Sequence, residues 1–176
     1  SRWADFGVPV SGGERGMVAM MGGVPKNGVI FECVGVPGMV QALMCDIRFA
    51  AAGAKFTTAF ARRGLIAEYG MSWVLPRLVG QARALDLLFS GRVFLAEEAA
   101  QMGLVNEVVA PEFLLDRALE YAAELATFAS PTSMAVMKRQ VYADWDRTLV
   151  GATEDAVELM KASLRRDDFN EGVASF

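Results

Sequence analysis

The stretch MVQALMCDIRFAAAGAKFTT, residues 39–58, decides the fold, because it holds one predicted helix and two predicted strands in succession. The helix formers cluster in its first part, whereas the two short segments that follow, joined through Gly53, are typical of strands. We expect the helix at residues 39–45 and the strands at residues 47–51 and 55–58. Another apolar strand is expected just upstream, at residues 29–34. This alternation of strand and helix predicts a mixed α/β core.

The rest of the chain divides into a mixed part and a helical part. Before residue 111 we expect a short helix at 16–21, helices at 70–79, 81–89 and 97–102, and a strand at 104–109. Proline in a helix interior removes a hydrogen bond, so Pro76 is expected to divide the helix at 70–79. After it we expect helices at 111–129, 131–143, 148–165 and from 167 onward. The predicted domains are therefore residues 1–110 and residues 111–176.

Composition excludes several classes of protein. The 176 residues are 53% hydrophobic and 22% charged, which is typical of one globular chain with an apolar excess. The net charge is −4 and no Lys or Arg run is present, so nucleic acid is not an expected partner. The most apolar stretch is interrupted by Glu32, Pro37 and Gln41, so no membrane span is expected. The apolar excess favours burial between subunits.

The chain contains no histidine, which excludes Ser-His and Cys-His nucleophilic pairs and histidine-ligated metals. No metal or other cofactor is therefore expected. Two cysteines, Cys33 and Cys45, have a spacing that fits neither a zinc site nor a disulfide scaffold. They are expected to be buried thiols in a reducing, cytoplasmic environment.

Three motifs resemble the crotonase superfamily, the enoyl-CoA hydratases and isomerases. They are MCDIRFAAAGAKF at 44–56, LPRLVG at 75–80 and ALDLLFSGRVFLAEEAAQMGLVNEVV at 84–109. The resemblance implies a ββα spiral core and acyl-CoA thioester substrates, coenzyme A being part of the substrate. It also implies a C-terminal helical trimerisation region, and hence a homotrimer or a dimer of trimers. The N-terminal part of the family fold is expected to be missing ahead of Ser1.

An oxyanion hole requires preorganised backbone donors for a thioester enolate. The resemblance places the family's oxyanion glycine on Pro37, which has no N–H to donate. A slip of the alignment would give the role to Gly35, Gly38 or Met39. The alternative is that the glycines here only form a tight turn between strand and helix.

A carboxylate is needed to move protons in this chemistry. The family's two hydratase glutamates fall on Val40 and Phe60, so we expect Glu68 to act as the single acid/base. Enclosure by Leu65, Ile66 and Tyr69 would raise the pKa of Glu68, and Phe60, Leu65 and Ile66 are expected to line the substrate site. Alternatively, Glu68 pairs with Arg62 or Arg63, or caps the helix after it.

Two functions are therefore expected. The first is an enzyme of the hydratase or isomerase type, for which one carboxyl suffices to shift a double bond. The second is a catalytically impaired homologue that binds acyl-CoA or acts as a structural subunit, which the residues Pro37, Val40 and Phe60 favour. A fold-related serine peptidase is excluded, because no histidine can activate a serine.

Overall fold

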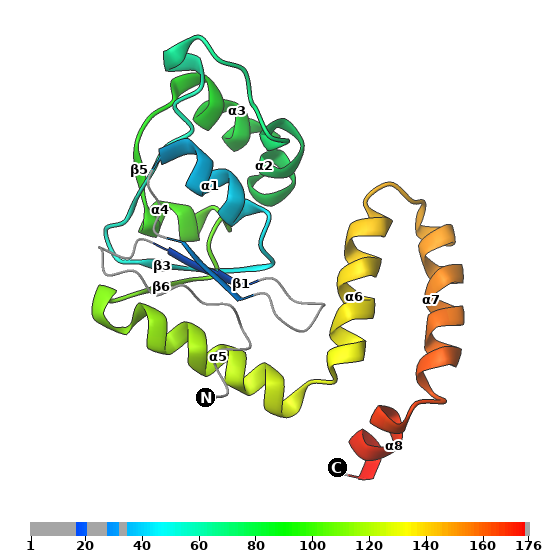
Figure 1. The fold of residues 1–176 in the computed structure, drawn as a ribbon. Helices are drawn as coiled ribbons and strands as arrows, with labels where there is room; N and C mark the ends of the chain where they lie inside the picture. The colour runs from blue at the N-terminus through cyan, green and yellow to red at the C-terminus, as the bar shows by residue number, and fades with distance from the viewer. Residues whose placement is uncertain (1–16, 21–27, 32–34, 175–176) are drawn as a thin grey trace. The chain divides into compact units, whose positions relative to one another are not determined.

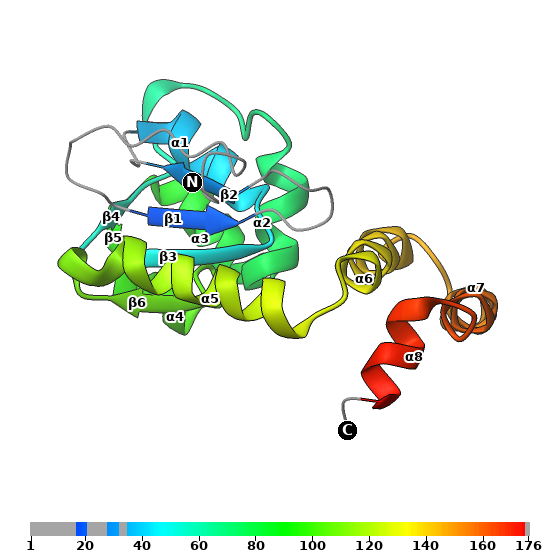
Figure 2. The same ribbon diagram turned by 60° about the horizontal axis from the view of Figure 1, so that its bottom comes forward.

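A mixed four-stranded sheet organises the first part of the chain. The computed structural model describes residues 17–20, 28–31 and 35–174. The strands are β1 (Met17–Met20), β2 (Gly28–Phe31), β3 (Ile47–Ala51) and β6 (Glu107–Val109), in the order β2-β1-β3-β6. Strand β1 is antiparallel to β2 and β3, whereas β3 and β6 are parallel. Figure 2 shows these four strands following one another across the sheet.

The predicted strand at residues 47–51 is confirmed, with identical bounds, as β3. The predicted short helix at 16–21 is wrong, because Met17–Met20 forms a strand. Its backbone pairs with β2 on one side and β3 on the other, and such pairing outweighs a weak local helix preference. The upstream strand is confirmed for Gly28–Phe31, while residues 32–34 lie outside the described part of the chain.

Helices cover both faces of this sheet (Figure 1). On one face lie α1 (Gly35–Leu43), α2 (Met71–Val79), α3 (Gln81–Ser90) and α4 (Ala96–Gln101); on the other lies α5 (Leu114–Phe128). Alternate residues of β3 face the two layers, as a strand requires. Ala50 joins the apolar cluster of the first four helices, whereas Phe49 and Ala51 pack with Leu114 and Ala118 of α5.

A second, two-stranded sheet joins the segment before α2 to the one before α4. It pairs β4 (Lys55–Phe56) with β5 (Phe94–Leu95) in antiparallel register, so β4 is shorter than the predicted strand. The partners Phe56 and Phe94 are both buried, and their rings stack with centroids 5.6 Å apart. The sheet thereby fixes the position at which the chain leaves β4.

The helix α2 is continuous through Pro76, so the predicted division at this proline is wrong. The missing proline N–H removes one intrahelical bond. Burial of Met71, Val74, Leu75 and Val79 offsets that loss, since packing rather than propensity supplies most helix stability.

The described residues form two compact units, of which the first extends to residue 122 and the second covers residues 123–174. The second contains the end of α5, then α6 (Pro131–Asp144), α7 (Leu149–Ser163) and α8 (Asp167–Ala174). A short turn, η3 (Pro111–Phe113), precedes α5. The helices predicted after residue 111 are thus confirmed. The assignment of residues 1–110 and 111–176 to a core and an oligomerisation region stays a prediction.

Side-chain caps start two helices of the second unit. Ser130 accepts a hydrogen bond from the Ser133 N–H (3.1 Å) at the start of α6, and Thr148 accepts one from the Gly151 N–H (3.2 Å) at the start of α7. Such caps satisfy amides that the first helical turn leaves without partners. The predicted starts of these two helices are therefore confirmed.

Candidate active site

The loop of residues 64–70 carries Glu68 from the short helix η2 (Ala61–Arg63) to α2. At its start, the Arg63 and Leu65 amides both donate to the Phe60 carbonyl, at 2.9 Å and 3.0 Å. At its end, the Met71 amide donates to the Glu68 carbonyl at 3.0 Å. The backbone of Glu68 is thus fixed directly before a helix whose first residue is buried.

Unusual backbone conformations occur on both sides of this carboxylate. In the part of the chain that the structure describes, Ala59 (φ 46°) and Tyr69 (φ 53°) are the only non-glycine residues with positive φ. Such conformations cost about 1–3 kcal/mol each and occur preferentially at functional sites. Both residues flank the segment from Phe60 to Glu68. The strain therefore marks this segment as the candidate site.

The Glu68 side chain is half-buried. The expected apolar enclosure is wrong, because Leu65, Ile66 and Tyr69 are 46%, 80% and 69% exposed. These side chains point away from the core since the loop between η2 and α2 runs over the surface. Leu65 and Ile66 instead present apolar surface to solvent.

Neither structural alternative for Glu68 holds in this arrangement. Arg62 donates to the Ser90 carbonyl, and no hydrogen bond or ion pair joins Arg63 to Glu68 within the described residues. The N-cap position of α2 is Gly70, which has no side-chain cap bond. The Glu68 carboxylate consequently has no hydrogen-bond or ion-pair partner among residues 17–20, 28–31 and 35–174.

The three oxyanion candidates all lie in α1, which begins at Gly35 rather than at residue 39 as predicted. The first amides of a helix have no intrahelical acceptor, whereas later ones bond to the carbonyl four residues earlier. In this helix the N–H groups of Gly35 and Gly38 are among the first four, whereas that of Met39 is in the second group. Pro37, the third residue of the helix, contributes no N–H at all.

The positions of the family's two hydratase glutamates are apolar and buried. Val40 is 7% exposed and Phe60 is 2% exposed, and both belong to the large core cluster. Phe60, predicted as a substrate contact, therefore packs inside the core. The loop and α1 approach each other nearby, because a Cβ built on Gly70 would lie 3.6 Å from Met44 Cε, just after α1 ends.

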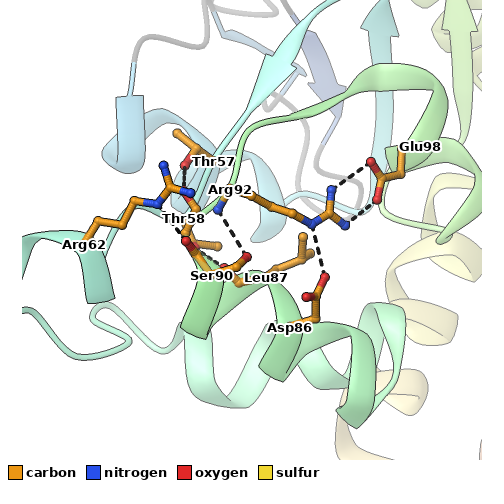
Figure 3. Close-up of polar contacts among 9 residues, drawn as sticks. Thr57, Thr58, Arg62, Asp86, Leu87, Ser90, Arg92 and Glu98 are labelled. Atoms are coloured by element: carbon orange, nitrogen blue, oxygen red, sulfur yellow. Dashed lines mark hydrogen bonds and ion pairs between the residues drawn. The ribbon is translucent and has the colours of Figure 1, made fainter.

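Hydrogen bonds that were not foreseen tie the chain before the loop to the end of α3 (Figure 3). Three side chains donate to backbone carbonyls: Thr57 to Gly91, Thr58 to Leu87 and Arg62 to Ser90. Thr58 is 1% exposed, so its bond is an interior one. A threonine pair and an arginine before a loop carry no local signal for such bonds, because their partners are distant in sequence.

Arg92 forms a second polar cluster that links α3 to α4 (Figure 3). Its guanidinium binds both carboxylate oxygens of Glu98, and it bonds Asp86 at 3.2 Å. The hydrogen bond with Glu98, followed by that with Asp86, raises the pKa of Arg92, and the same bond to Arg92 lowers the pKa of Glu98. Both glutamates of α4, Glu97 and Glu98, lie in its first turn, and Glu97 also accepts a hydrogen bond from the Gly53 amide at 2.9 Å.

Neither a metal site nor a membrane-spanning helix occurs within residues 17–20, 28–31 and 35–174. No three Asp, Glu or Cys side chains there come together in a way that would hold a metal ion. No helix there has the length and apolar character needed to cross a bilayer. Cys45 is a buried thiol as predicted, and Cys33 lies outside the described residues.

The sequence profile described as enoyl-CoA hydratase/isomerase matches residues 32–176. The chain belongs to the enoyl-CoA hydratase/isomerase family. It is 34% identical over 167 residues to a probable enoyl-CoA hydratase of Rhizobium meliloti, covering 95% of this chain and 61% of the relative. It is 35% identical over 176 residues to the 1,2-epoxyphenylacetyl-CoA isomerase of Escherichia coli, covering 98% of this chain and 66% of the relative. The chain thus spans less than two thirds of these curated relatives.

Solved structures of the enoyl-CoA hydratase/isomerase family share the crotonase fold of this chain. The probable enoyl-CoA hydratase/isomerase of Mycobacterium abscessus superposes with a TM-score of 0.77 at 30% identity, over 80% of this chain and 57% of that one. The enoyl-CoA hydratase EchA12_1 of Mycobacterium marinum is 70% identical, with a TM-score of 0.59, over 65% of this chain and 58% of that one. The predicted α/β crotonase-like core is therefore confirmed.

Proposed function

We propose that the protein is an enzyme of the hydratase or isomerase type that acts on an acyl-CoA thioester, with Glu68 as its single acid/base. The observation that carries the proposal is the half-buried carboxylate of Glu68, which has no hydrogen-bond or ion-pair partner among the described residues. It lies next to Tyr69, whose φ is positive. Family membership supports the substrate class. Coenzyme A belongs to the substrate, so no separate cofactor is invoked.

A shift of a carbon–carbon double bond is the reaction that one carboxyl can support. The Glu68 carboxylate removes a proton from the carbon next to the thioester carbonyl, and the electron pair of the broken C–H bond forms an enolate. The resulting carboxylic acid, whose proton exchanges with solvent, then protonates the far carbon of the original double bond, where an electron pair of the enolate forms the new C–H bond. No net proton, oxidant or water is consumed, which fits the apolar residues at positions 40 and 60.

The enolate oxygen needs backbone donors while the proton is in transit. Of Gly35, Gly38 and Met39, this proposal favours Gly35 and Gly38 as donors, because their N–H groups have no acceptor within α1. The helix N-terminus adds a favourable dipole at the same point. Leu65 and Ile66, both exposed beside Glu68, are proposed to contact the acyl chain.

The test is a comparison of Glu68→Gln with Glu112→Gln, which removes an exposed carboxylate from η3. A 3-enoyl-CoA is supplied, and both formation of the conjugated 2-enoyl-CoA and deuterium uptake from D2O are measured. We expect Glu68→Gln to lose about 10²–10⁴-fold in turnover while Glu112→Gln retains it. Unchanged turnover in Glu68→Gln would reject the assignment.

The second candidate is an acyl-CoA-binding homologue without catalysis, favoured by Pro37 at the family's oxyanion position and by buried Val40 and Phe60. Calorimetry with a panel of acyl-CoAs separates the two proposals. Binding by the wild-type protein without turnover or deuterium uptake would support the second and exclude the first.

We also propose that residues 111–176 form a trimerisation region in a cytoplasmic homotrimer or dimer of trimers. The second unit exposes many large apolar side chains, which isolated surfaces rarely carry. Examples are Phe128, Met137, Leu149, Val150 and Val173, each more than half exposed. The buried thiol of Cys45, which forms no disulfide among the described residues, supports the reducing compartment. A monomer in light scattering at micromolar concentration would contradict the assembly.

A further inference from the structure

The Arg62 side chain lies on the surface, yet both its guanidinium group and its alkyl chain contact the end of α3. The Nε–H donates to the Ser90 carbonyl at 2.7 Å. Ser90 is the last residue of α3, and a cation is favoured at a helix C-terminus, where carbonyls lack intrahelical donors. A Cβ built on Gly91 would lie 3.1 Å from Arg62 Cγ and 3.3 Å from Cδ. The absence of a side chain at Gly91 therefore lets the arginine stem lie across the end of the helix.

The two threonines before Arg62 complete the same attachment. Thr58 Oγ1 donates to the Leu87 carbonyl at 2.7 Å, and Thr57 Oγ1 donates to the Gly91 carbonyl at 3.1 Å. Buried Thr58 fixes the chain ahead of the loop. Arg62 makes the last side-chain hydrogen bond to the end of α3 before the loop begins at Gly64. Its neighbour Arg63 is exposed and makes no comparable contact with any described residue.

Between these points the loop contacts the large core cluster through the partly buried Ala67. Leu65, Ile66 and Tyr69 are exposed, so their side chains contribute little packing energy. The position of Glu68 consequently depends on Ala67 and on the two ends of the loop. One end is Met71, which is 1% exposed in the core, and the other is the turn that Arg62 fastens to α3.

We propose that Arg62 is a positioning residue, which holds the start of the 64–70 loop against the end of α3 and thereby sets the place of Glu68. This inference rests on the proposed function, in which Glu68 moves the proton. Proton transfer demands close approach, and a displacement of about 1 Å can cost about 100-fold in rate. Arg62 acts through the loop and does not touch substrate.

The experiment compares three variants of the full-length protein. Arg62→Met keeps the alkyl stem and removes the hydrogen bond, Arg62→Lys restores a donor, and Arg83→Met removes an exposed arginine elsewhere on α3 as the control. Hydrogen exchange of the 64–70 amides and the kcat and KM for 3-enoyl-CoA are measured together.

We expect Arg62→Met to raise amide exchange in residues 64–70 and to lower kcat about fivefold, the effect of losing one charge-assisted bond at an exposed site, with KM within about twofold. Arg62→Lys should recover most of kcat, and Arg83→Met should match the wild type. Equal exchange and equal kcat in Arg62→Met would overturn the inference. So would a uniform rise in exchange over the whole first unit, since that result indicates general destabilisation.

The outcomes separate this inference from the proposed function. If Glu68→Gln is inactive while Arg62→Met keeps full kcat, the positioning role fails and the proposed function stands. If the wild type turns over no 3-enoyl-CoA, the proposed function fails, and the catalytic consequence of Arg62 fails with it. Exchange in residues 64–70 then still reports whether Arg62 fastens the loop.

Discussion

Gly91 and Gly64 offer a matched pair of substitutions that measures how closely Arg62 packs. Both glycines follow a helix in the left-handed region, at φ 52° and ψ 27° for Gly91 and at φ 69° and ψ 20° for Gly64. Alanine in this region costs about 1–2 kcal/mol for steric reasons. The backbone contribution to ΔΔG should therefore be nearly the same for Gly91→Ala and Gly64→Ala.

The two sites differ in what a new methyl group would meet. At Gly64 no heavy atom lies within 4 Å of the added Cβ. At Gly91 the Cβ would lie 3.1 Å from Arg62 Cγ and 3.4 Å from Ala59 Cα, so the arginine stem must shift. Overpacking costs about 1–3 kcal/mol, and a flexible side chain places this site at the lower end. Gly91→Ala should thus cost about 1 kcal/mol more than Gly64→Ala.

Urea unfolding of the single variants and of Gly91→Ala combined with Arg62→Ala closes a double-mutant cycle. If the arginine stem is the obstacle, the cost of Gly91→Ala should fall by about 1 kcal/mol when Arg62 is truncated. Equal costs at Gly91 and Gly64, or a coupling energy below about 0.3 kcal/mol, would refute the reasoning. Such a result would mean that the stem of Arg62 does not rest on Gly91 in solution.

Three more predictions concern stability. The hydrogen bond with Arg92 lowers the pKa of Glu98 from 4.5. The stabilisation that this bond gives the folded state is therefore present above pH 4.5 and is lost as the pH falls through the lowered pKa. Glu98→Gln should consequently make acid unfolding, followed by circular dichroism, less steep. Thr58→Val should cost about 1 kcal/mol in urea, because the Leu87 carbonyl keeps its bond from the Gly91 amide, and a cost above about 3 kcal/mol would contradict this. Leu114→Ala, at a fully buried site, should cost about 3 kcal/mol in thermal unfolding, and a cost below about 1 kcal/mol would indicate that α5 does not pack on β3.

The sequence predicts the elements whose signals are local. Strand β3 is a short segment that is apolar except for Arg48 and lies between turn residues, and the caps Ser130 and Thr148 mark the helix starts that follow them. The strand Met17–Met20 was mistaken for a helix, because its identity comes from pairing with strands elsewhere in the chain. Local sequence preference therefore predicted the helices and strands correctly, except where pairing or packing with distant segments outweighed it.

The candidate site was only partly predictable for the same reason. Glu68 could be singled out by its place among apolar residues and by the family resemblance. The bonds of Thr57, Thr58 and Arg62 join residues that are 34, 29 and 28 positions apart, and no local pattern reveals them. The exposure of Leu65 and Ile66 was also missed, because an apolar side chain in a loop is buried only if another element covers it.

The proline in α1 connects this fold to its chemistry. As the third residue of the helix, Pro37 occupies a position where the missing N–H would have had no intrahelical acceptor, so the proline leaves the hydrogen bonding of α1 intact. The same substitution removes a backbone donor from the position where the family places its oxyanion glycine. Stability and catalysis therefore respond differently to one residue. The proposed reaction therefore depends on another amide of the first turn of this helix, such as that of Gly35 or Gly38.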